Sequence, residues 1–369
     1  MKNFVIHVFS MLFILATVNT ATANLHQFSK SNSEHTLSVI DKSQRKLFYP
    51  GSLAILPEDG RTIYFEAFAA AKREIRIEIC VLEDPLILQS LQNALRRGVK
   101  VRVIVDNRKY QSTPDEQVNL ATYLTQSGGE LHLSNPIFPR SFPKVILIDD
   151  RFVLISSACL DSTTFAQYRD YTYVSNSCCT IQAMSELFEN DWQYSASLGL
   201  PFPTFNPTPP IHQQNLIVAP VDASAKLVSF IQQAERTLDV TSELLGNPTL
   251  ESELSAAVAK GVLVRLIAPE IVNGATPEMQ ELQITSLNQL KAAGIHVHVT
   301  TPPETQQFPY MHARTAISDG KRVYLGSISL SPDSTTYNRG VGIILKKKHV
   351  VNKMKRQFKI DYHSKSHNF

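Results

Sequence analysis

The chain has 369 residues, of which 43% are hydrophobic, and 36 Lys and Arg residues face 33 Asp and Glu residues. This composition excludes a disordered polar chain, and the 14 glycines exclude a collagen-like repeat. At about 100 to 200 residues per domain, the length leaves room for two domains with their own cores. The four cysteines are too few for a disulfide-dense scaffold.

The N-terminus has the pattern of a secretory signal. Lys2 precedes an apolar run from Phe4 to Val18, and small residues follow at 21–23, where a signal peptidase would cut. We expect residues 1–23 to be a cleaved signal peptide and the mature protein to be secreted or periplasmic; an uncleaved membrane anchor is the alternative.

Export would permit disulfides among Cys80, Cys159, Cys178 and Cys179. Three pairings are possible if all four pair, and a bond between the adjacent Cys178 and Cys179 would be strained, so one of these two is expected to pair elsewhere. There is no C-x-x-C spacing and the histidines lie far from the cysteines in sequence, so no zinc site is predicted.

The predicted elements occur twice in the same order. The first copy contains a helix from Phe65, a strand over 75–81, a helix over 85–97 and a strand over 99–105. The second contains a helix over 227–234, a strand over 238–241, a helix over 248–260 and a strand over 262–267. This alternation indicates an α/β fold built from an internal repeat.

The later part of the repeat keeps a constant offset of 170 residues. Matching residues are Lys144 and Arg314, Asp149 and Asp319, Ser157 and Ser327, Met184 and Met354, Phe188 and Phe358, and Asp191 and Asp361. Between the copies, residues 201–210 contain five prolines, which favour a stiff, extended linker. We therefore predict halves at 24–200 and 213–369, joined by a linker at 201–212.

One polar segment recurs in each half. Lys144 and Asp149 precede Ser156-Ser157, and His312, Arg314 and Asp319 precede Gly326-Ser327. Residues two apart on a strand point to the same side, so a histidine and a cation at this spacing face one phosphate together. The segments resemble the phospholipase D superfamily motif H-x-K-x4-D-x6-G-S-x-N, which occurs twice in a chain or once per subunit of a dimer, and the resemblance covers nearly the whole mature chain.

The resemblance implies two αβα sandwich halves related by a pseudo-twofold axis, with the site at their interface. In the family one histidine attacks phosphorus, the other protonates the leaving oxygen, two lysines hold the phosphate oxygens, and no metal or other cofactor is required. The Asp of the motif helps to order it. The implied catalytic residues are His312, Lys144, Arg314, Asp319 and Asp149, and the implied substrate-binding residues are Ser157, Ser327, Asp170 and Asn338.

The sequence departs from the family pattern at several positions. Phe142 replaces the first histidine, Arg314 the second lysine, Cys159 and Ser329 the Asn, Ser156 a Gly, and Gly340 an acid that Asp170 keeps in the first half. The missing histidine is the one more often cast as nucleophile, and His312 holds the usual general-acid position. The motif residues that remain in the two halves complement one another, and together they are expected to form one phosphate pocket.

Structural roles compete with the functional ones. Lys144 is alternatively an edge residue that reaches solvent. Asp149 and Asp319 precede tight turns and are equally candidates for turn formation, while Ser157 and Ser327 are candidates for local hydrogen bonding. His132, His296 and His298 lie on alternating strand patterns and are expected to be non-catalytic.

The C-terminal segment 346–369 carries eight Lys and Arg residues against one acid, whereas the rest of the mature chain is net acidic. This charge would attract anionic lipid headgroups or nucleic acid, but the stronger interpretation is an amphipathic helix of the repeat with a solvated basic face. We expect an exported phospholipase D-superfamily hydrolase or transferase that prefers a phospholipid headgroup. The alternatives are an inactive protein that binds phosphodiesters, a lipid surface or a protein partner, and an endonuclease, which the acidic body disfavours. Oligomeric state stays open.

Overall fold

The computed structural model describes residues 46–108, 123–205, 213–300 and 309–364. The predicted signal peptide at 1–23 and residues 206–212 of the predicted linker lie outside the described residues. Leu47 begins a compact unit that runs to Phe369 and includes both repeats. Among the described helices, none combines the length and apolar character that crossing a bilayer requires.

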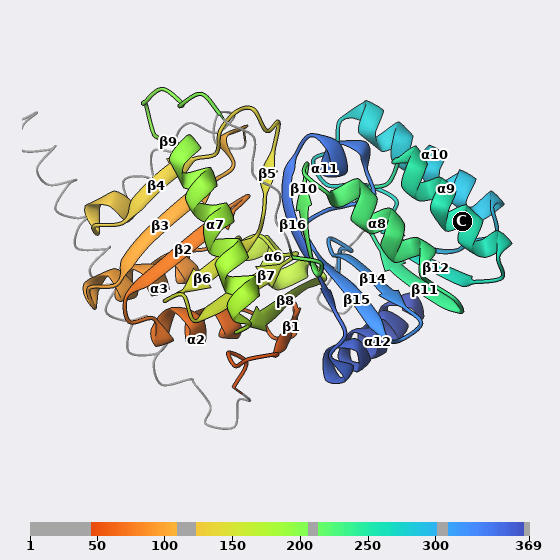
Figure 1. Cartoon of the computed structure of the whole chain (residues 1–369), viewed down its shortest axis with the longest axis horizontal. Coiled ribbons are helices and arrows are strands. Elements are labelled where there is room, and N and C mark those ends of the chain that lie inside the picture. The colour runs from red at the N-terminus through yellow and green to blue at the C-terminus, as the bar shows by residue number, and fades with distance from the viewer. Residues whose placement is uncertain (1–45, 109–122, 206–212, 301–308, 365–369) are drawn as a thin grey trace, which may run out of the picture. The chain divides into compact units, whose positions relative to one another are not determined.

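The first repeat forms a sheet flanked by helices (Figure 1). In chain order its elements are β1 (Leu53–Leu56), α2 (Thr62–Ala70), β2 (Glu74–Ile79), α3 (Pro85–Arg96), β3 (Lys100–Val105), β4 (Glu130–Leu133), β5 (Ser141–Phe142), β6 (Val145–Ile148), β7 (Phe152–Ser156), α6 (Ser162–Gln167), β8 (Asp170–Ser175), α7 (Cys178–Tyr194) and β9 (Ala196–Ser197).

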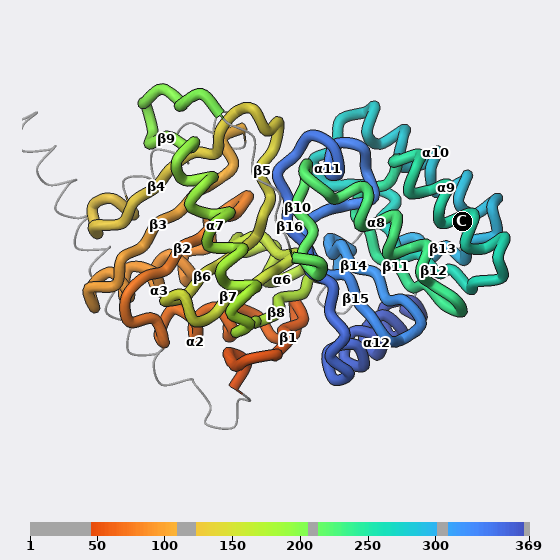
Figure 2. Tube along the Cα trace, viewed as in Figure 1, coloured from red at the N-terminus to blue at the C-terminus, as the bar shows by residue number. Residues whose placement is uncertain are grey.

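The second repeat follows the same path, from β10 in green to α12 in blue (Figure 2). Its elements are β10 (Leu216–Ala219), α8 (Ala223–Gln232), β11 (Thr237–Thr241), α9 (Pro248–Ala259), β12 (Leu263–Pro269), α10 (Pro277–Ala292), β13 (His296–Thr300), β14 (Arg314–Ser318), β15 (Arg322–Gly326), α11 (Pro332–Thr336), β16 (Arg339–Leu345) and α12 (Lys348–Tyr362).

The two sheets have equivalent topology. The first runs β1-β8-β7-β6-β2-β3-β4-β9, and the second runs β10-β16-β15-β14-β11-β12-β13. In each sheet three strands are parallel, β2-β3-β4 and β11-β12-β13, and the strands that carry the polar motif pair antiparallel beside them. The predicted internal repeat is therefore confirmed as two mixed α/β sheets.

Local sequence signals explain where the equivalent helices start. The Asp84 carboxylate caps α3 by accepting from the Ile87 N–H, and the Asn247 side chain caps α9 in the same way, each with a proline as the next residue. Gly98 and Gly261 follow the two helices with φ of +84° and +86°, a conformation that glycine adopts without strain.

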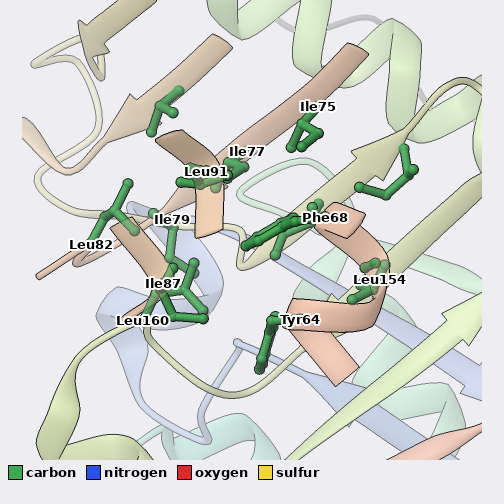
Figure 3. Close-up of a cluster of buried hydrophobic side chains, with 14 of the residues drawn as sticks. Tyr64, Phe68, Ile75, Ile77, Ile79, Leu82, Ile87, Leu91, Leu154 and Leu160 are labelled. Atoms are coloured by element: carbon green, nitrogen blue, oxygen red, sulfur yellow. The ribbon is translucent and has the colours of Figure 1, made fainter. Parts of the chain in front are cut away.

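Three hydrophobic cores follow from this arrangement. Helices α2 and α3 pack their apolar faces on β2 and β7, as Tyr64, Phe68, Ile77, Ile87 and Leu154 show in Figure 3. Helices α8 and α9 cover the second sheet in the same manner. The remaining core combines the other faces of both sheets with α7 and α12, so the two halves share one hydrophobic interior.

Reciprocal ion pairs also join the halves. Arg169 of the first half contacts Asp361 on α12, and Arg339 of the second half contacts Asp191 on α7 with two hydrogen bonds of 2.8 and 2.7 Å. Each arginine lies 170 residues from the other, as do the two aspartates. This exchange is the signature of a pseudo-twofold axis, and it anchors the residues that immediately precede Asp170 and Gly340.

Candidate functional site

His312 lies two residues before Arg314, the first residue of β14, and pairs with an acid of the opposite half. Its Nδ1 is 2.7 Å from Oδ2 of Asp170, the first residue of β8. The other oxygen of Asp170 accepts from the Ser157 hydroxyl at 2.5 Å, and Ser157 Oγ in turn accepts from the Tyr171 N–H. Two of the predicted substrate-binding residues, Ser157 and Asp170, therefore orient the predicted catalytic histidine.

The hydrogen-bond network assigns the protonation state of His312. Arg314 Nη1 lies 3.0 Å from His312 Nε2, and a guanidinium can only donate, so Nε2 carries a lone pair. The proton then resides on Nδ1, facing Asp170. Burial, reinforced by the charges of Arg314 and Lys144, holds the pKa of His312 well below its usual value. The ring is neutral, with an unprotonated nitrogen at Nε2.

Lys144 is buried beside this pair, with 2% of its surface exposed. Its Nζ donates to the Ser157 carbonyl at 2.5 Å, and Arg314 Nη1 lies 3.5 Å from the same oxygen. Its backbone has a φ of +53°, a left-handed conformation that in non-glycine residues is concentrated at functional sites. The alternative of an edge lysine that reaches solvent is therefore wrong.

Asp170 and Lys144 both have shifted pKa values. Burial raises the pKa of Asp170 to about 6, although Lys144 and the Ser157 hydroxyl act in the opposite direction. Burial, with the neighbouring Arg314, lowers the pKa of Lys144 to about 7. Perturbed groups of this kind mark candidate functional sites.

Glu243, in the segment after β11, is a site residue that sequence reasoning missed. It forms an ion pair with Arg314 Nη2, and its other oxygen accepts from the Tyr310 hydroxyl at 3.0 Å. Burial alone would raise the pKa of Glu243, but Arg314 outweighs it and lowers the pKa. The only signal in the sequence was its place four residues before the Asn247 cap, matched by Cys80 four residues before Asp84.

Two predicted catalytic residues, Asp149 and Asp319, lie away from His312. Asp149 sits at the opposite end of β6 from Lys144, where its carboxylate accepts from the N–H groups of residues 72–74. Asp319 does the same with residues 235–237. Both have a φ of +55° and lead into hairpin turns. Their place fits the turn-forming alternative, and the structure gives neither carboxylate a contact with His312 within the described residues.

The pair that would mirror His312 and Asp170, a histidine at position 142 and an acid at position 340, is absent. Phe142 is in register with Gly340 across the β5–β16 pairing, so neither a histidine nor an acid stands there. The Phe142 ring packs toward the first hydrophobic core, and the Arg140 guanidinium lies 4.7 Å from the ring centre.

Two further predicted substrate-binding residues lie outside the His312 network. Ser327 Oγ exchanges hydrogen bonds with the backbone of Val341 and does not contact His312 within the described residues. Asn338 is buried, and its Oδ1 has no hydrogen-bond partner within the described parts of the chain. Ser327 thus fits the local hydrogen-bonding alternative.

The histidines expected to be non-catalytic belong to other parts of the sheets. His132 on β4 stacks on Trp192 with ring centres 3.8 Å apart and its Nδ1 lies 2.8 Å from Ser195 Oγ. His296 and His298 lie on β13, at the edge of the second sheet. The described residues offer no group of three or more His, Cys, Asp and Glu side chains arranged to hold a metal ion.

The structure also selects one disulfide. Cys80 and Cys159 are bonded, with the Cα atoms 6.1 Å apart, while Cys178 and Cys179 on α7 are free. The expectation that one of the adjacent cysteines pairs elsewhere was wrong, because the strand end at Cys80 already faces Cys159. Cys80 and Cys159 are the first-half counterparts of Glu243 and Ser329, so the disulfide replaces the polar contacts found beside Arg314.

Comparisons with known proteins agree with this geometry. The family model described as cardiolipin synthase, PLD-like domain, matches residues 64–192 and 227–362. The chain belongs to the phospholipase D superfamily. No curated protein sequence matches it.

Two solved structures show the same fold. One is phosphatidylserine synthase from Haemophilus influenzae, with a TM-score of 0.64 and 12% identity over 84% of this chain and 86% of that one. The other is polyphosphate kinase from Porphyromonas gingivalis, with a TM-score of 0.60 and 17% identity over 90% of this chain and 55% of that one. At these identities the likeness concerns the fold, and the phospholipase D-like αβα halves are confirmed.

Proposed function

We propose that this protein is an exported phosphodiester hydrolase or transferase that works by phosphoryl transfer at His312. The observation that carries the proposal is the Asp170–His312 hydrogen bond of 2.7 Å, made between halves and flanked by two cations. Asp170 fixes the tautomer, which leaves the Nε2 lone pair, beside Arg314, as the base or nucleophile. Lys144 and Arg314 supply the positive charge that a phosphodiester requires.

A phospholipid headgroup is the substrate that we favour. The outward positions of α12 and its N-terminal flank carry exposed cations, at Lys346, Lys347, Lys348, Lys355, Arg356 and Lys359. Next to them Ile360 is 62% exposed. A basic helix face with an exposed apolar residue suits an anionic membrane surface. The predicted secretory signal supports a site of action outside the cytoplasm.

The alternative is a protein that binds phosphodiesters without turning them over. Two observations favour it. Phe142 and Gly340 stand where a second histidine and its acid would be, and Arg314 is already paired with Glu243. With Lys144 and Arg314 facing Asp170 and Glu243, the two positive charges in the site meet two carboxylates. An endonuclease of the same superfamily is a weaker alternative, because the body of the chain is net acidic.

Turnover assays separate these functions. The purified mature chain and its His312→Ala variant would be given bis(4-nitrophenyl) phosphate, vesicles of mixed anionic and zwitterionic phospholipids, and single- and double-stranded DNA. The proposal predicts hydrolysis of the activated diester and of lipid, lost in the variant. Binding of vesicles with background rates for both folded proteins would support the inactive alternative, and cleavage of DNA alone would support the endonuclease.

A further inference from the structure

The site holds one histidine, so a second group has to protonate the leaving oxygen if His312 attacks phosphorus. His312 itself is neutral, with its only ring proton given to Asp170. Arg314 keeps its charge at all working pH values and cannot transfer a proton. The proton donor must therefore be another group that surrounds these two residues.

Asp170, Glu243 and Tyr310 are already committed to other partners. Asp170 accepts at one oxygen from Ser157 and at the other from His312. Glu243 is held by Arg314 and by the Tyr310 hydroxyl. Burial, together with Glu243, raises the pKa of Tyr310 far above the working range. None of these groups holds a proton that is both available and easily lost.

Lys144 differs from all of them. An ammonium carries three N–H groups, and within the described residues Lys144 uses one of them, on the Ser157 carbonyl, and forms no ion pair. Arg314 Nη1 lies 3.5 Å from the same carbonyl oxygen and 3.0 Å from His312 Nε2, so the three side chains belong to one hydrogen-bonded cluster. Lys144 is thus a cation with spare donors beside the reactive nitrogen.

We propose that His312, although it holds the usual general-acid position, attacks phosphorus, and that Lys144 is the proton donor to the leaving oxygen. The inference rests on the proposed function and deepens it. The charged groups that face Lys144 are Arg314, Asp170, Glu243 and Asp161, with His312 beside them. Burial and Arg314 together lower the pKa of Lys144 to about 7, which brings proton transfer into the physiological range.

The reaction balances in two steps. In the first, the Nε2 lone pair forms a bond to phosphorus, the P–O bond to the leaving group breaks, and Lys144 gives its proton to that oxygen. In the second, a water or alcohol oxygen attacks phosphorus, the P–N bond breaks, and the proton of the attacking oxygen passes to Lys144. Arg314 supplies charge throughout and exchanges no proton.

Leaving-group dependence tests this assignment. Two phosphodiesters with the same phosphoryl part are used, one with a nitrophenol leaving group, which departs without protonation, and one with an alkyl alcohol, which requires it. Lys144→Arg keeps the charge and removes the labile proton. The proposal predicts a loss of about 10²- to 10⁴-fold in kcat on the alkyl substrate and a loss at least tenfold smaller on the nitrophenyl substrate.

Arg314→Lys is the matched control. Because Arg314 contributes charge and no proton, this variant should lower kcat by the same factor on both substrates. Equal losses for Lys144→Arg would overturn the proposal and leave Lys144 as a phosphate-binding residue. If the wild-type chain turns over neither substrate, the proposed function fails and this inference with it. If the wild type is active and Lys144→Arg lowers kcat equally on both substrates, the proposed function stands and only the role of Lys144 as proton donor fails.

The wild-type pH profile gives a readout that needs no variant to fold. On the alkyl substrate kcat/KM should fall as pH rises through about 7, because Lys144 then loses the proton that it must donate. On the nitrophenyl substrate this fall should be much weaker. Identical profiles for the two substrates would overturn the proposal.

Discussion

The two halves of the molecule share a fold and differ in what they bring to the site. The first half supplies Lys144, Ser157 and Asp170, whereas the second supplies His312, Arg314 and Glu243. Phe142 and Gly340, which stand where the second histidine and its acid would be, are paired in register. Each histidine–acid pair of such a site is made between the halves, so the chain has kept one whole pair and lost the other.

This difference shows that the His312 cluster is assembled from both halves and not within one repeat. Neither half keeps a complete motif, yet the retained residues are complementary and meet at one point. In the second half Glu243 forms an ion pair with Arg314. In the first half the equivalent position is Cys80, which is bonded to Cys159. Both halves bring charged groups to the site, but only the second has a carboxylate at the position that the disulfide occupies in the first.

The largest expected effect comes from breaking the retained pair. Asp170→Asn leaves the shape intact but removes the charge that fixes the His312 tautomer, so kcat should fall about 10²- to 10⁴-fold. Asp150→Asn, a change at an exposed carboxylate beyond the far end of β6, is the control and should leave kcat within about twofold. Steady-state hydrolysis of an activated phosphodiester measures both.

The pH profile sharpens this prediction. Burial raises the pKa of Asp170 to about 6, so in the folded protein the carboxylate becomes neutral as pH falls through that value. Wild-type activity should decline on the acid side of about pH 6, and Asp170→Asn should lack that decline. An unchanged acid limb in the variant would contradict the assignment of the limb to Asp170.

The ion pairs between halves come next. Arg339→Met would leave Asp191 buried without its partner and should lower the free energy of unfolding by about 3–5 kcal/mol. The double variant Arg339→Met/Asp191→Leu removes both charges and should recover much of that loss. Urea unfolding monitored by circular dichroism gives the values, and a double variant as unstable as the single one would contradict this account.

The disulfide should contribute somewhat less. It closes a loop with a sequence separation of 79 residues, and its removal in Cys80→Ala/Cys159→Ala should lower the free energy of unfolding by about 2–4 kcal/mol. Changing the exposed Cys178 and Cys179 to Ser should alter it by less than about 0.5 kcal/mol. Thermal unfolding with and without a reducing agent compares the two pairs.

The smallest effect on catalysis is expected at the surface. Helix α12 is basic where its counterpart α7 is acidic, so Lys355→Glu/Arg356→Glu should weaken binding to anionic vesicles on the order of tenfold or more. Turnover of a small activated diester should stay within about twofold. Gln182→Glu on α7 is the control, and equal vesicle binding by all three proteins would remove α12 from the lipid-binding surface.

The sequence predicted the architecture well because the repeat is recorded in helix caps, glycines and a constant offset. It also named Lys144, Ser157, Asp170, His312 and Arg314, and the structure brings these residues together. It left two roles open for Asp149 and Asp319, since a carboxylate before a turn looks alike whether it binds the backbone or a substrate, and in the fold both accept from backbone N–H groups. Glu243 escaped notice because its partner Arg314 is 71 residues away and only the folded sheet brings the two together.

The central claim is that His312 of the second half and Asp170 with Lys144 of the first half make one working site. The most direct test compares kcat/KM on an activated phosphodiester for the wild type, His312→Gln and the equivalent first-half change Phe142→Leu. The account predicts background rates for His312→Gln and activity within about tenfold of wild type for Phe142→Leu. Wild-type rates in His312→Gln, or equal losses in both variants, would contradict it.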